Sequence, residues 1–314
     1  MRRYIIRRVL LLIPTIILVS FMVFCLVRII PGDIVQLMVA EQGFADDTAK
    51  LRSMLGMDKP IYTQYLKYVR GVLKGDLGTS LWSGQPVMTE IARRLPISFR
   101  LAVMALCWTL LLGVPIGVIS AIKQDTWLDY IIRSLGIAGL SIPGFWIATL
   151  LLVFGAIWFK WVPPMDYVPF GQDPLRSLAQ LIAPSIILAL AGSASIMRMT
   201  RTMMLEVLHE DYIRTAQAKG LTTVVVITRH ALKNAMIPVL TIMGMQLAFL
   251  TGGTVIMENI FVLPGMGKYL LTAISWRDYP VIQGINLFIC SLIITINLIV
   301  DLLYGFFDPR IRYR

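Results

Sequence analysis

Six long apolar stretches constrain the fold of this chain more than any other feature of its sequence. Each is close to the roughly 20 residues that an α-helix needs to cross a hydrocarbon core about 30 Å thick. The stretches are Val9–Val27, Leu101–Ile122, Ser134–Phe159, Leu178–Met197, Ala235–Met257 and Val281–Val300. They predict an all-α polytopic membrane protein with six transmembrane helices. Several stretches contain proline, but neighbouring helices can satisfy the carbonyls that a proline leaves free, so spans are still expected there. These prolines are Pro14, Pro115, Pro143, Pro184 and Pro238.

The composition agrees with a membrane protein and argues against a nucleic-acid-binding one. The chain is 57% hydrophobic and 15% charged, whereas soluble domains are closer to half apolar and a quarter charged. Its net charge of +11 comes from Lys and Arg residues that flank the apolar stretches. We therefore expect the basic residues to face the cytoplasm beside a lipid bilayer and do not expect nucleic acid as a partner.

The distribution of Lys and Arg predicts that both termini are cytoplasmic. An even number of spans places the two ends on one side, and the segments of that side are rich in cations. They contain Arg2, Arg3, Arg7, Arg8, Lys123, Arg133, Arg198, Arg201, Arg214, Lys219, Arg229, Lys233, Arg310, Arg312 and Arg314. The short loops of the opposite side contain only Lys160, Arg176, Lys268 and Arg277.

This orientation divides the chain into three parts. Residues 1–30 form a cytoplasmic end and the first span, and residues 31–96 form an extracytoplasmic lobe. Residues 97–314 form a five-span core whose cytoplasmic loop covers residues 198–234. The lobe contains a helical pattern from Ile61 to Val72 that ends at Lys74-Gly75-Asp76, so a small helical outer-face lobe is expected.

The loop between the fourth and fifth stretches has the pattern of a helix followed by a sharp stop. Met204, Leu208, Tyr212 and Thr215 or Ala216 are spaced as one stripe of a continuous helix. Glu210 and Arg214 form an i, i+4 pair of opposite charge. Gly220 suits the helix end, where a positive φ costs little only for glycine.

The same segment, Arg214-Thr-Ala-Gln-Ala-Lys-Gly220, resembles the cytoplasmic Glu-Ala-Ala-x-x-x-Gly loop of ATP-binding-cassette (ABC) importer permeases. Ala216 and Gly220 match that pattern, whereas Arg214 and Thr215 replace its Glu and Ala. The usual ending is altered too, because proline is delayed to Pro238. These departures are the form seen in the dipeptide, oligopeptide and nickel branch of the family.

Motifs along nearly the whole chain resemble the same branch, and in particular the first of its two paired permeases. They are Ile30-Pro-Gly-Asp33, Leu55-Gly-Met-Asp-Lys-Pro60, Gly75-Asp-Leu-Gly78, Glu258-Asn-Ile-Phe261, Pro264-Gly-Met-Gly267, Arg277-Asp-Tyr-Pro-Val-Ile-Gln283, Asp301-Leu-Leu-Tyr304 and Asp308-Pro-Arg310. The resemblance implies a type I ABC importer permease fold. It further implies transport of dipeptides or oligopeptides across a bacterial inner membrane, with nickel, glutathione or an oligosaccharide as alternative cargo.

The resemblance also implies partners. They are a second homologous permease, two cytoplasmic ATPase subunits and an extracytoplasmic substrate-binding protein. The chain has no GxxxxGK[ST] motif, so ATP and Mg are expected on the partner subunits, and no cofactor or enzymatic activity is expected on this chain. The residues expected to couple it to the ATPase are Glu210, Asp211, Tyr212, Arg214, Thr215, Ala216, Lys219 and Gly220.

Polar residues in or near the spans are candidates for a translocation path. Polar groups are costly in a membrane and usually face a cavity or another helix. The candidates are Gln246, Glu258, Asp278, Asn286 and Asn297, with hydrogen bonding between helices as the alternative interpretation. An intramembrane hydrolase is disfavoured because no Ser/His or metal constellation is present. A secondary transporter is disfavoured because no stretch contains Asp or Glu.

Overall fold

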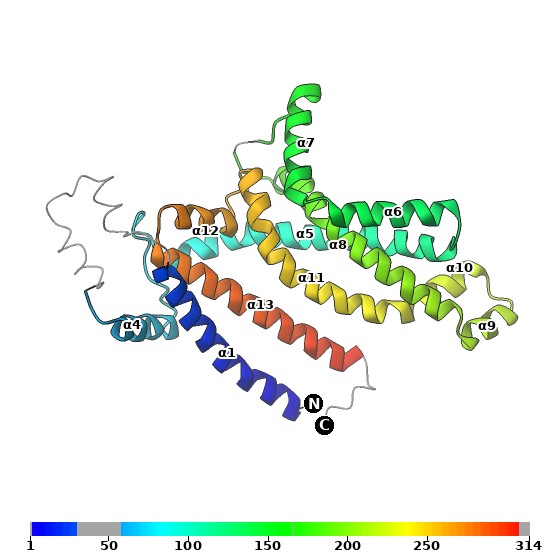
Figure 1. Cartoon of the computed structure of the whole chain (residues 1–314), viewed down its shortest axis with the longest axis horizontal. Helices are drawn as coiled ribbons and strands as arrows, with labels where there is room; N and C mark the ends of the chain where they lie inside the picture. The colour runs from blue at the N-terminus through cyan, green and yellow to red at the C-terminus, as the bar shows by residue number, and fades with distance from the viewer. Residues whose placement is uncertain (1, 30–57, 165, 308–314) are drawn as a thin grey trace. The chain divides into compact units, whose positions relative to one another are not determined.

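The computed structural model describes residues 2–29, 58–164 and 166–307 (Figure 1). The motifs at Ile30-Pro-Gly-Asp33 and Asp308-Pro-Arg310 lie outside the described residues, as do Leu55, Gly56 and Met57 and the last three arginines. The predicted all-α class is confirmed, because the β pairing within the described ranges is an isolated bridge between Thr79 and Pro86. The described residues form two compact units, one of residues 2–29, 58–96 and 265–295 and the other of residues 97–164, 166–264 and 296–307.

The first unit is built around the end of α1 and the beginning of α13. Its elements are α1 (Arg2–Ile29), α4 (Ile61–Leu73), the first turns of α5 (Val87–Ile122), α12 (Met266–Ser275) and the larger part of α13 (Tyr279–Phe307). Val27 of α1 packs with Val281, Ile282 and Ile285 of α13 in a buried apolar cluster. α4 lies against α1, since the Tyr65 ring contacts those of Phe21 and Phe24 at centroid distances of 5.5 and 5.1 Å.

The second unit is built around α8. Its elements are the remainder of α5, α6 (Trp127–Ser141), α7 (Gly144–Phe159), α8 (Pro174–Leu208), α9 (Asp211–Ala218), α10 (Thr223–Val225), the π-helix η1 (Val226–Ala231) and α11 (Leu232–Ile260). α8 contacts α6, α7 and α11. Its start is encoded locally, because the Asp173 side chain accepts a hydrogen bond from the Arg176 backbone N–H and Pro174 occupies the first helical position.

Two glycines bring α5 and α8 unusually close. A β-carbon on Gly113 would lie 2.9 Å from the Ser193 carbonyl oxygen, and one on Gly117 would lie 2.6 Å from that of Met197. Any larger side chain would therefore displace α8 backbone. These GxxxG positions serve helix packing.

Every predicted apolar stretch falls within helical segments, but the third does not form one straight span. α6 and α7 meet at a bend of 93°, where Pro143 occupies the N-cap position of α7. The prediction that Ser134–Phe159 is a single helix is therefore wrong, because Ile142 and Pro143 leave the helical conformation. α5, α8 and residues 279–299 of α13 are individually long and apolar enough to cross a membrane, and the bent pair qualifies jointly. The apolar part of α1 is the shorter segment Leu10–Cys25.

Candidate functional site

The segment between α8 and α11 forms the helix and sharp stop that the sequence predicts. α8 ends at Leu208, Glu210 occupies the N-cap position of α9, and Lys219 follows the last residue of α9. Gly220 has φ of +78°, which confirms the predicted positive φ. A β-carbon built on Gly220 would meet nothing within 4 Å, so the requirement for glycine comes from the backbone conformation alone.

The break between α8 and α9 changes which residues face inward. Met204 and Ile213 are fully buried and Ala216 is 7% exposed, whereas Tyr212 and Thr215 lie on the exposed side. The predicted stripe is therefore wrong at Tyr212 and Thr215, although its alternative end, Ala216, does face inward, because residues 209 and 210 interrupt the helix and shift its phase. Ala216 packs within its own chain, in a cluster shared with Ala121, Val226, Ala231 and Ala235.

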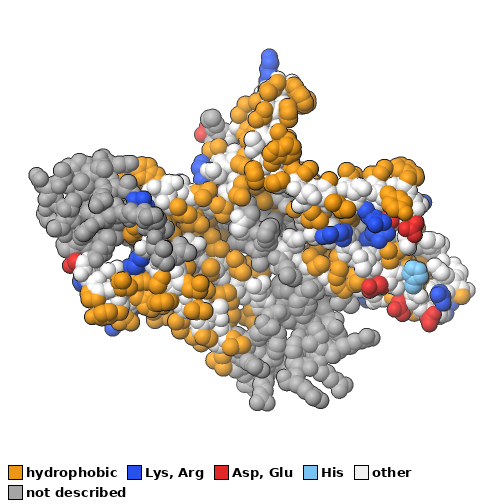
Figure 2. Space-filling model, in the orientation of Figure 1, with side chains coloured by type: hydrophobic (Ala, Val, Ile, Leu, Met, Phe, Trp, Pro, Cys, Tyr) orange, Lys and Arg blue, Asp and Glu red, His pale blue; other side chains and the backbone are white. Residues whose placement is uncertain are grey.

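The exposed part of this segment carries charged, polar and apolar groups together. Figure 2 shows acidic, basic and His side chains gathered on the right of the view, where Figure 1 places α9 and α10. We define the coupling surface as a subset of its exposed residues: Glu210, Asp211, Tyr212, Arg214, Thr215, Gln217, Lys219, Gly220, Leu221 and Val224. Such a mixed surface on a short, projecting helix is suited to binding another protein.

The charges on α9 do not pair as the sequence suggested. Arg214 Nη1 lies 3.4 Å from Asp211 Oδ1, and their side chains are 71% and 96% exposed. Arg214 thus interacts at i, i+3 spacing, since Glu210 precedes the helix. Exposed pairs of this kind contribute little to stability and leave both groups available to a partner.

One hydrogen bond connects the coupling surface to the helix that follows it. Asn234 of α11 donates from Nδ2 to the Tyr212 hydroxyl at 2.8 Å. The connection between them includes η1, and a π-helical turn is a frequent feature of functional segments. Sequence periodicity does not predict this bond, because the two residues are 22 positions apart.

A buried ion pair that sequence reasoning missed lies at the start of α6. Asp129 is fully buried and accepts hydrogen bonds from Arg201 Nε at 2.9 Å and Arg201 Nη2 at 2.8 Å. It also accepts from the Ser120 hydroxyl and the Asp125 backbone N–H. This bidentate arrangement joins the end of α5, the start of α6 and the last turns of α8.

The five translocation-path candidates are distributed over both units. Glu258 is fully buried, and the Ser98 hydroxyl donates to its Oε1 at 2.6 Å. Asn286 donates to the Ile282 carbonyl one turn earlier at 2.8 Å. Gln246 is partly buried with its Oε1 3.5 Å from a β-carbon built on Gly192, and Asn297 is exposed. Their role in a path stays a prediction.

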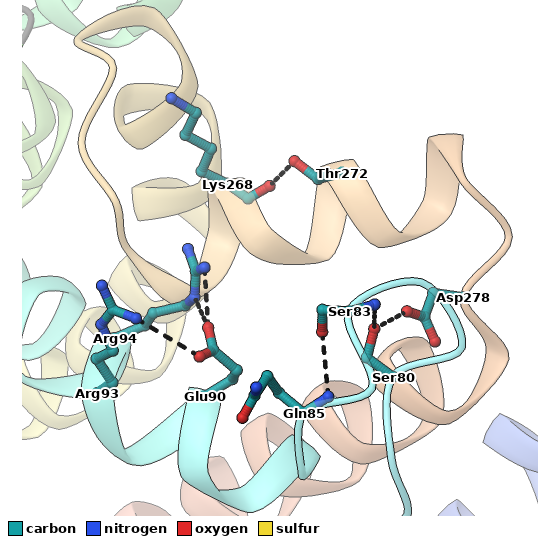
Figure 3. A network of polar contacts seen from close by, with 9 residues as sticks. All are labelled: Ser80, Ser83, Gln85, Glu90, Arg93, Arg94, Lys268, Thr272 and Asp278. Atoms are coloured by element: carbon teal, nitrogen blue, oxygen red, sulfur yellow. Dashed lines mark hydrogen bonds and ion pairs between the residues drawn. The ribbon is translucent and has the colours of Figure 1, made fainter.

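Asp278 belongs to a network that fixes the turn before α5 (Figure 3). The Ser80 hydroxyl donates to Asp278 Oδ2 at 2.6 Å, and the Leu81 backbone N–H donates to Oδ1 at 3.2 Å. Trp82 Nε1 donates to the Trp276 carbonyl at 2.8 Å. With only 4% of its surface exposed, Asp278 serves the packing of this unit.

Comparisons with known proteins cover the whole chain. Residues 113–313 match the family described as binding-protein-dependent transport system inner membrane component, and residues 1–102 match the amino-terminal part of such components. A dipeptide transport system permease protein, DppB, of Escherichia coli K12 is 40% identical over 338 aligned residues, with 100% of both chains covered. A putative peptide transport system permease protein of Brucella abortus is 40% identical over 313 residues, again with 100% of both covered.

Solved structures resemble the fold at lower sequence identity. A chain of the methionine ABC transporter MetNI in an inward-facing conformation has 14% identity and a TM-score of 0.53, covering 69% of this chain and 96% of its own. A second crystal form gives 16% identity and a TM-score of 0.54 with the same coverage. At these identities the likeness supports the fold.

Proposed function

This chain belongs to the binding-protein-dependent transport system inner membrane component family, and from that membership we propose that it forms the membrane-spanning path of an ABC importer for dipeptides or oligopeptides. The type I importer permease fold expected from the sequence agrees with the likeness to the methionine transporter. The peptide cargo is supported by the names of the relatives from Escherichia coli and Brucella abortus.

The coupling surface is the single observation that carries this function. α9 is anchored to its own chain through Ile213 and Ala216, and to α11 through the Tyr212–Asn234 hydrogen bond. Its other face exposes Arg214 and Lys219. A partner bound there would act on α8 and α11 together. We propose that this partner is a cytoplasmic ATPase subunit, which binds the ATP and Mg that the chain itself has no motif to hold.

The rest of the assembly follows from the family. A second homologous permease would complete the membrane path, two ATPase subunits would supply energy, and an extracytoplasmic binding protein would deliver the peptide. Both termini would face the cytoplasm, as the charge distribution favours. Residues 58–96 would then lie on the outer face, where the binding protein docks.

Charge reversal on the exposed side of α9 tests this proposal. Arg214→Glu with Lys219→Glu should weaken copurification of the ATPase by about tenfold or more, because charge complementarity steers and orients such interfaces. Membrane insertion should be unchanged, since both side chains are exposed. Arg176→Glu, an exposed position at the opposite end of α8, is the matched control. Normal ATPase retention and normal peptide uptake by the double variant would refute the coupling role.

Gly220 offers a second test that does not alter charge. Gly220→Val should cost at least about 1 kcal/mol, because a β-branched residue is strained at positive φ. Gly220→Asn is the control, since asparagine tolerates this conformation. We expect peptide uptake in proteoliposomes to fall for the valine variant and to persist for the asparagine variant. Equal uptake by both would show that the conformation at Gly220 is unimportant.

Orientation is tested by labelling single cysteines in a variant without Cys25, Cys107 and Cys290. A membrane-impermeant thiol reagent applied to whole cells with a permeable outer envelope should modify a cysteine at Lys74 and spare one at Gln217, both of which are exposed. The reverse pattern would invert the topology and remove the coupling surface from the ATPase.

A further inference from the structure

A cavity of about 300 Å³ lies within the first unit, between α1, α4, the turn at residues 76–78 and the first turns of α13. Its walls include Phe24 and Arg28 from α1 and Tyr68 from α4. The proposed transport function leaves this cavity without a role.

The cavity is lined by more cations than anions. Arg28, Lys59 and Lys67 line it, whereas Asp76 is its one acidic lining residue among those described. Arg28 is fixed in place, since it donates to the Phe24 carbonyl at 3.0 Å and to Gln64 Oε1. Neither lysine has an ion pair within the part of the chain that the structure describes. An anionic group placed in the cavity would lie near three cations, and two of them, the lysines, have no ion-pair partner among the described residues.

The wall also contains a polar side chain to which the described residues supply no hydrogen bond. Gln283 is 8% exposed and lines the cavity, and among the described residues no hydrogen bond involves its amide. The Tyr68 hydroxyl is buried and has no hydrogen-bond partner among the described residues. Burial raises the pKa of Tyr68 to about 12, so the phenol is neutral at physiological pH. Buried polar groups are nearly always hydrogen-bonded, so the Gln283 amide and the Tyr68 hydroxyl are available to a polar group placed in the cavity.

The sequence predicts that the cavity lies near a membrane surface. The apolar stretch of α1 ends at Val27, and Arg28 follows it directly. α13 begins at Tyr279, so Pro280 and Gln283 lie in its first two turns. Val27 packs against Val281, which places the exit of one apolar helix beside the entry of the next (Figure 1). Lipid headgroups occupy this level of a bilayer.

We propose that this cavity binds the phosphate headgroup of an anionic phospholipid. Arg28, Lys59 and Lys67 would contact the phosphate, and the Gln283 amide would donate to a phosphate or glycerol oxygen. Exposed apolar side chains of α1 (Leu18, Phe21 and Met22) and of α4 (Leu66) would lie along the acyl chains. The lipid would thereby hold α4 against α1 and α13.

A phospholipid suits the site better than a peptide carboxylate, which shares its negative charge. The apolar surface of α1 continues from the cavity wall toward the membrane interior, as an acyl chain requires and a dipeptide does not. The proposal uses only the first unit and the membrane level of Arg28. The lipid site does not depend on which side of the membrane Arg28 faces or on the coupling surface. Failure of the lipid proposal would therefore leave the transport proposal intact.

The test measures lipid binding to the full chain in its purified complex by native mass spectrometry, with short-chain phosphatidylglycerol as the probe. Lys59→Gln with Lys67→Gln should weaken binding about tenfold, since each cation near an anionic headgroup contributes appreciably. The matched control is Arg70→Gln with Lys74→Gln, which removes the same charge from exposed positions of α4 that do not line the cavity. The control should bind as the unaltered chain does. Equal weakening in both would show a general surface-charge effect and overturn the site.

Gln283→Leu separates a ligand-binding amide from a structural one. Removing an unpaired buried amide should leave the lipid-free chain at least as stable to heat, while the stabilisation by phosphatidylglycerol should be lost. Loss of stability without lipid, with lipid stabilisation retained, would contradict the proposal. Diacylglycerol, which lacks the phosphate, should not bind at this site. Displacement of phosphatidylglycerol by a dipeptide but not by glycerol phosphate would identify a peptide carboxylate site instead.

Discussion

The buried carboxylates of Asp129 and Asp278, one in each unit, are stabilised in different ways. Asp129 is paired with the guanidinium of Arg201, 72 positions away on α8. Asp278 accepts from an uncharged hydroxyl and a backbone N–H, and it lies directly before α13, whose N-terminus favours a negative charge. The first arrangement joins two long helices, and the second fixes a turn. Of these two buried carboxylates, only the one whose counter-charge lies on another helix joins two helices through an ion pair.

The largest effect should come from removing the cation of the first pair. Arg201→Met is expected to lower the free energy of unfolding by about 3–5 kcal/mol, because it leaves the Asp129 charge buried without its partner. Thermal or denaturant unfolding in detergent measures this. Adding Asp129→Asn to Arg201→Met should recover much of the loss. If single and double variants are equally unstable, packing of the Arg201 side chain matters more than its charge.

An intermediate effect is expected at the second carboxylate. Ser80→Ala removes the hydroxyl donor to Asp278 and should cost about 1.5–3 kcal/mol, the range for a hydrogen bond to a charged group. Hydrogen exchange at the amides of residues 80–85 should accelerate more than elsewhere. Ser83→Ala is the control, since its hydroxyl accepts only a long 3.4 Å bond from the Gln85 N–H (Figure 3). If Ser80→Ala lowers the free energy of unfolding as much as Arg201→Met does, the two carboxylates are not stabilised by interactions of different strength.

The smallest effect should come from an exposed, uncharged contact. Tyr212→Phe removes the bond to Asn234 and should cost about 0.5–1.5 kcal/mol, the range for a neutral hydrogen bond. Faster hydrogen exchange in α9 would report it, and peptide uptake per ATP hydrolysed should fall because α9 is less firmly joined to α11. Tyr62→Phe, at an exposed tyrosine of α4, should change neither. Unchanged exchange in α9 would mean that its apolar contacts suffice.

Local features of the fold were predictable because their causes are local. The apolar stretches and the positive φ of Gly220 depend on nearby residues and on backbone sterics. The break between α8 and α9 was missed because residues 209–210 carry no Pro or Gly. The sequence predicts a single span across Pro143. The bend there is not predictable, because sequence alone does not show whether neighbouring helices satisfy the freed carbonyls.

Features that join distant positions could not be predicted. Asp129 and Arg133 suggest a local i, i+4 pair, but the shorter contacts of Asp129 are with Arg201. Ala216 was assigned to the surface that meets a partner, whereas tertiary packing against Val226 and Ala231 buries it. Gln283 was part of a recognised motif, but its unpaired state depends on the elements that surround it. The periodicity of apolar residues predicts which face of a helix is buried, but it does not predict which other element packs against that face.

The close approach of α5 and α8 at Gly113 and Gly117 has a mechanical consequence. Helices whose backbones nearly touch cannot slide past one another without a steric clash, so α5 and α8 should move as one lever. At about 1.5 Å per residue, the 35 residues of α8 make that lever roughly 50 Å long. A small tilt imposed at the α9 end would then become a displacement of several ångströms at the far end. Replacing either glycine would alter the stiffness of this lever while leaving its point of attachment untouched.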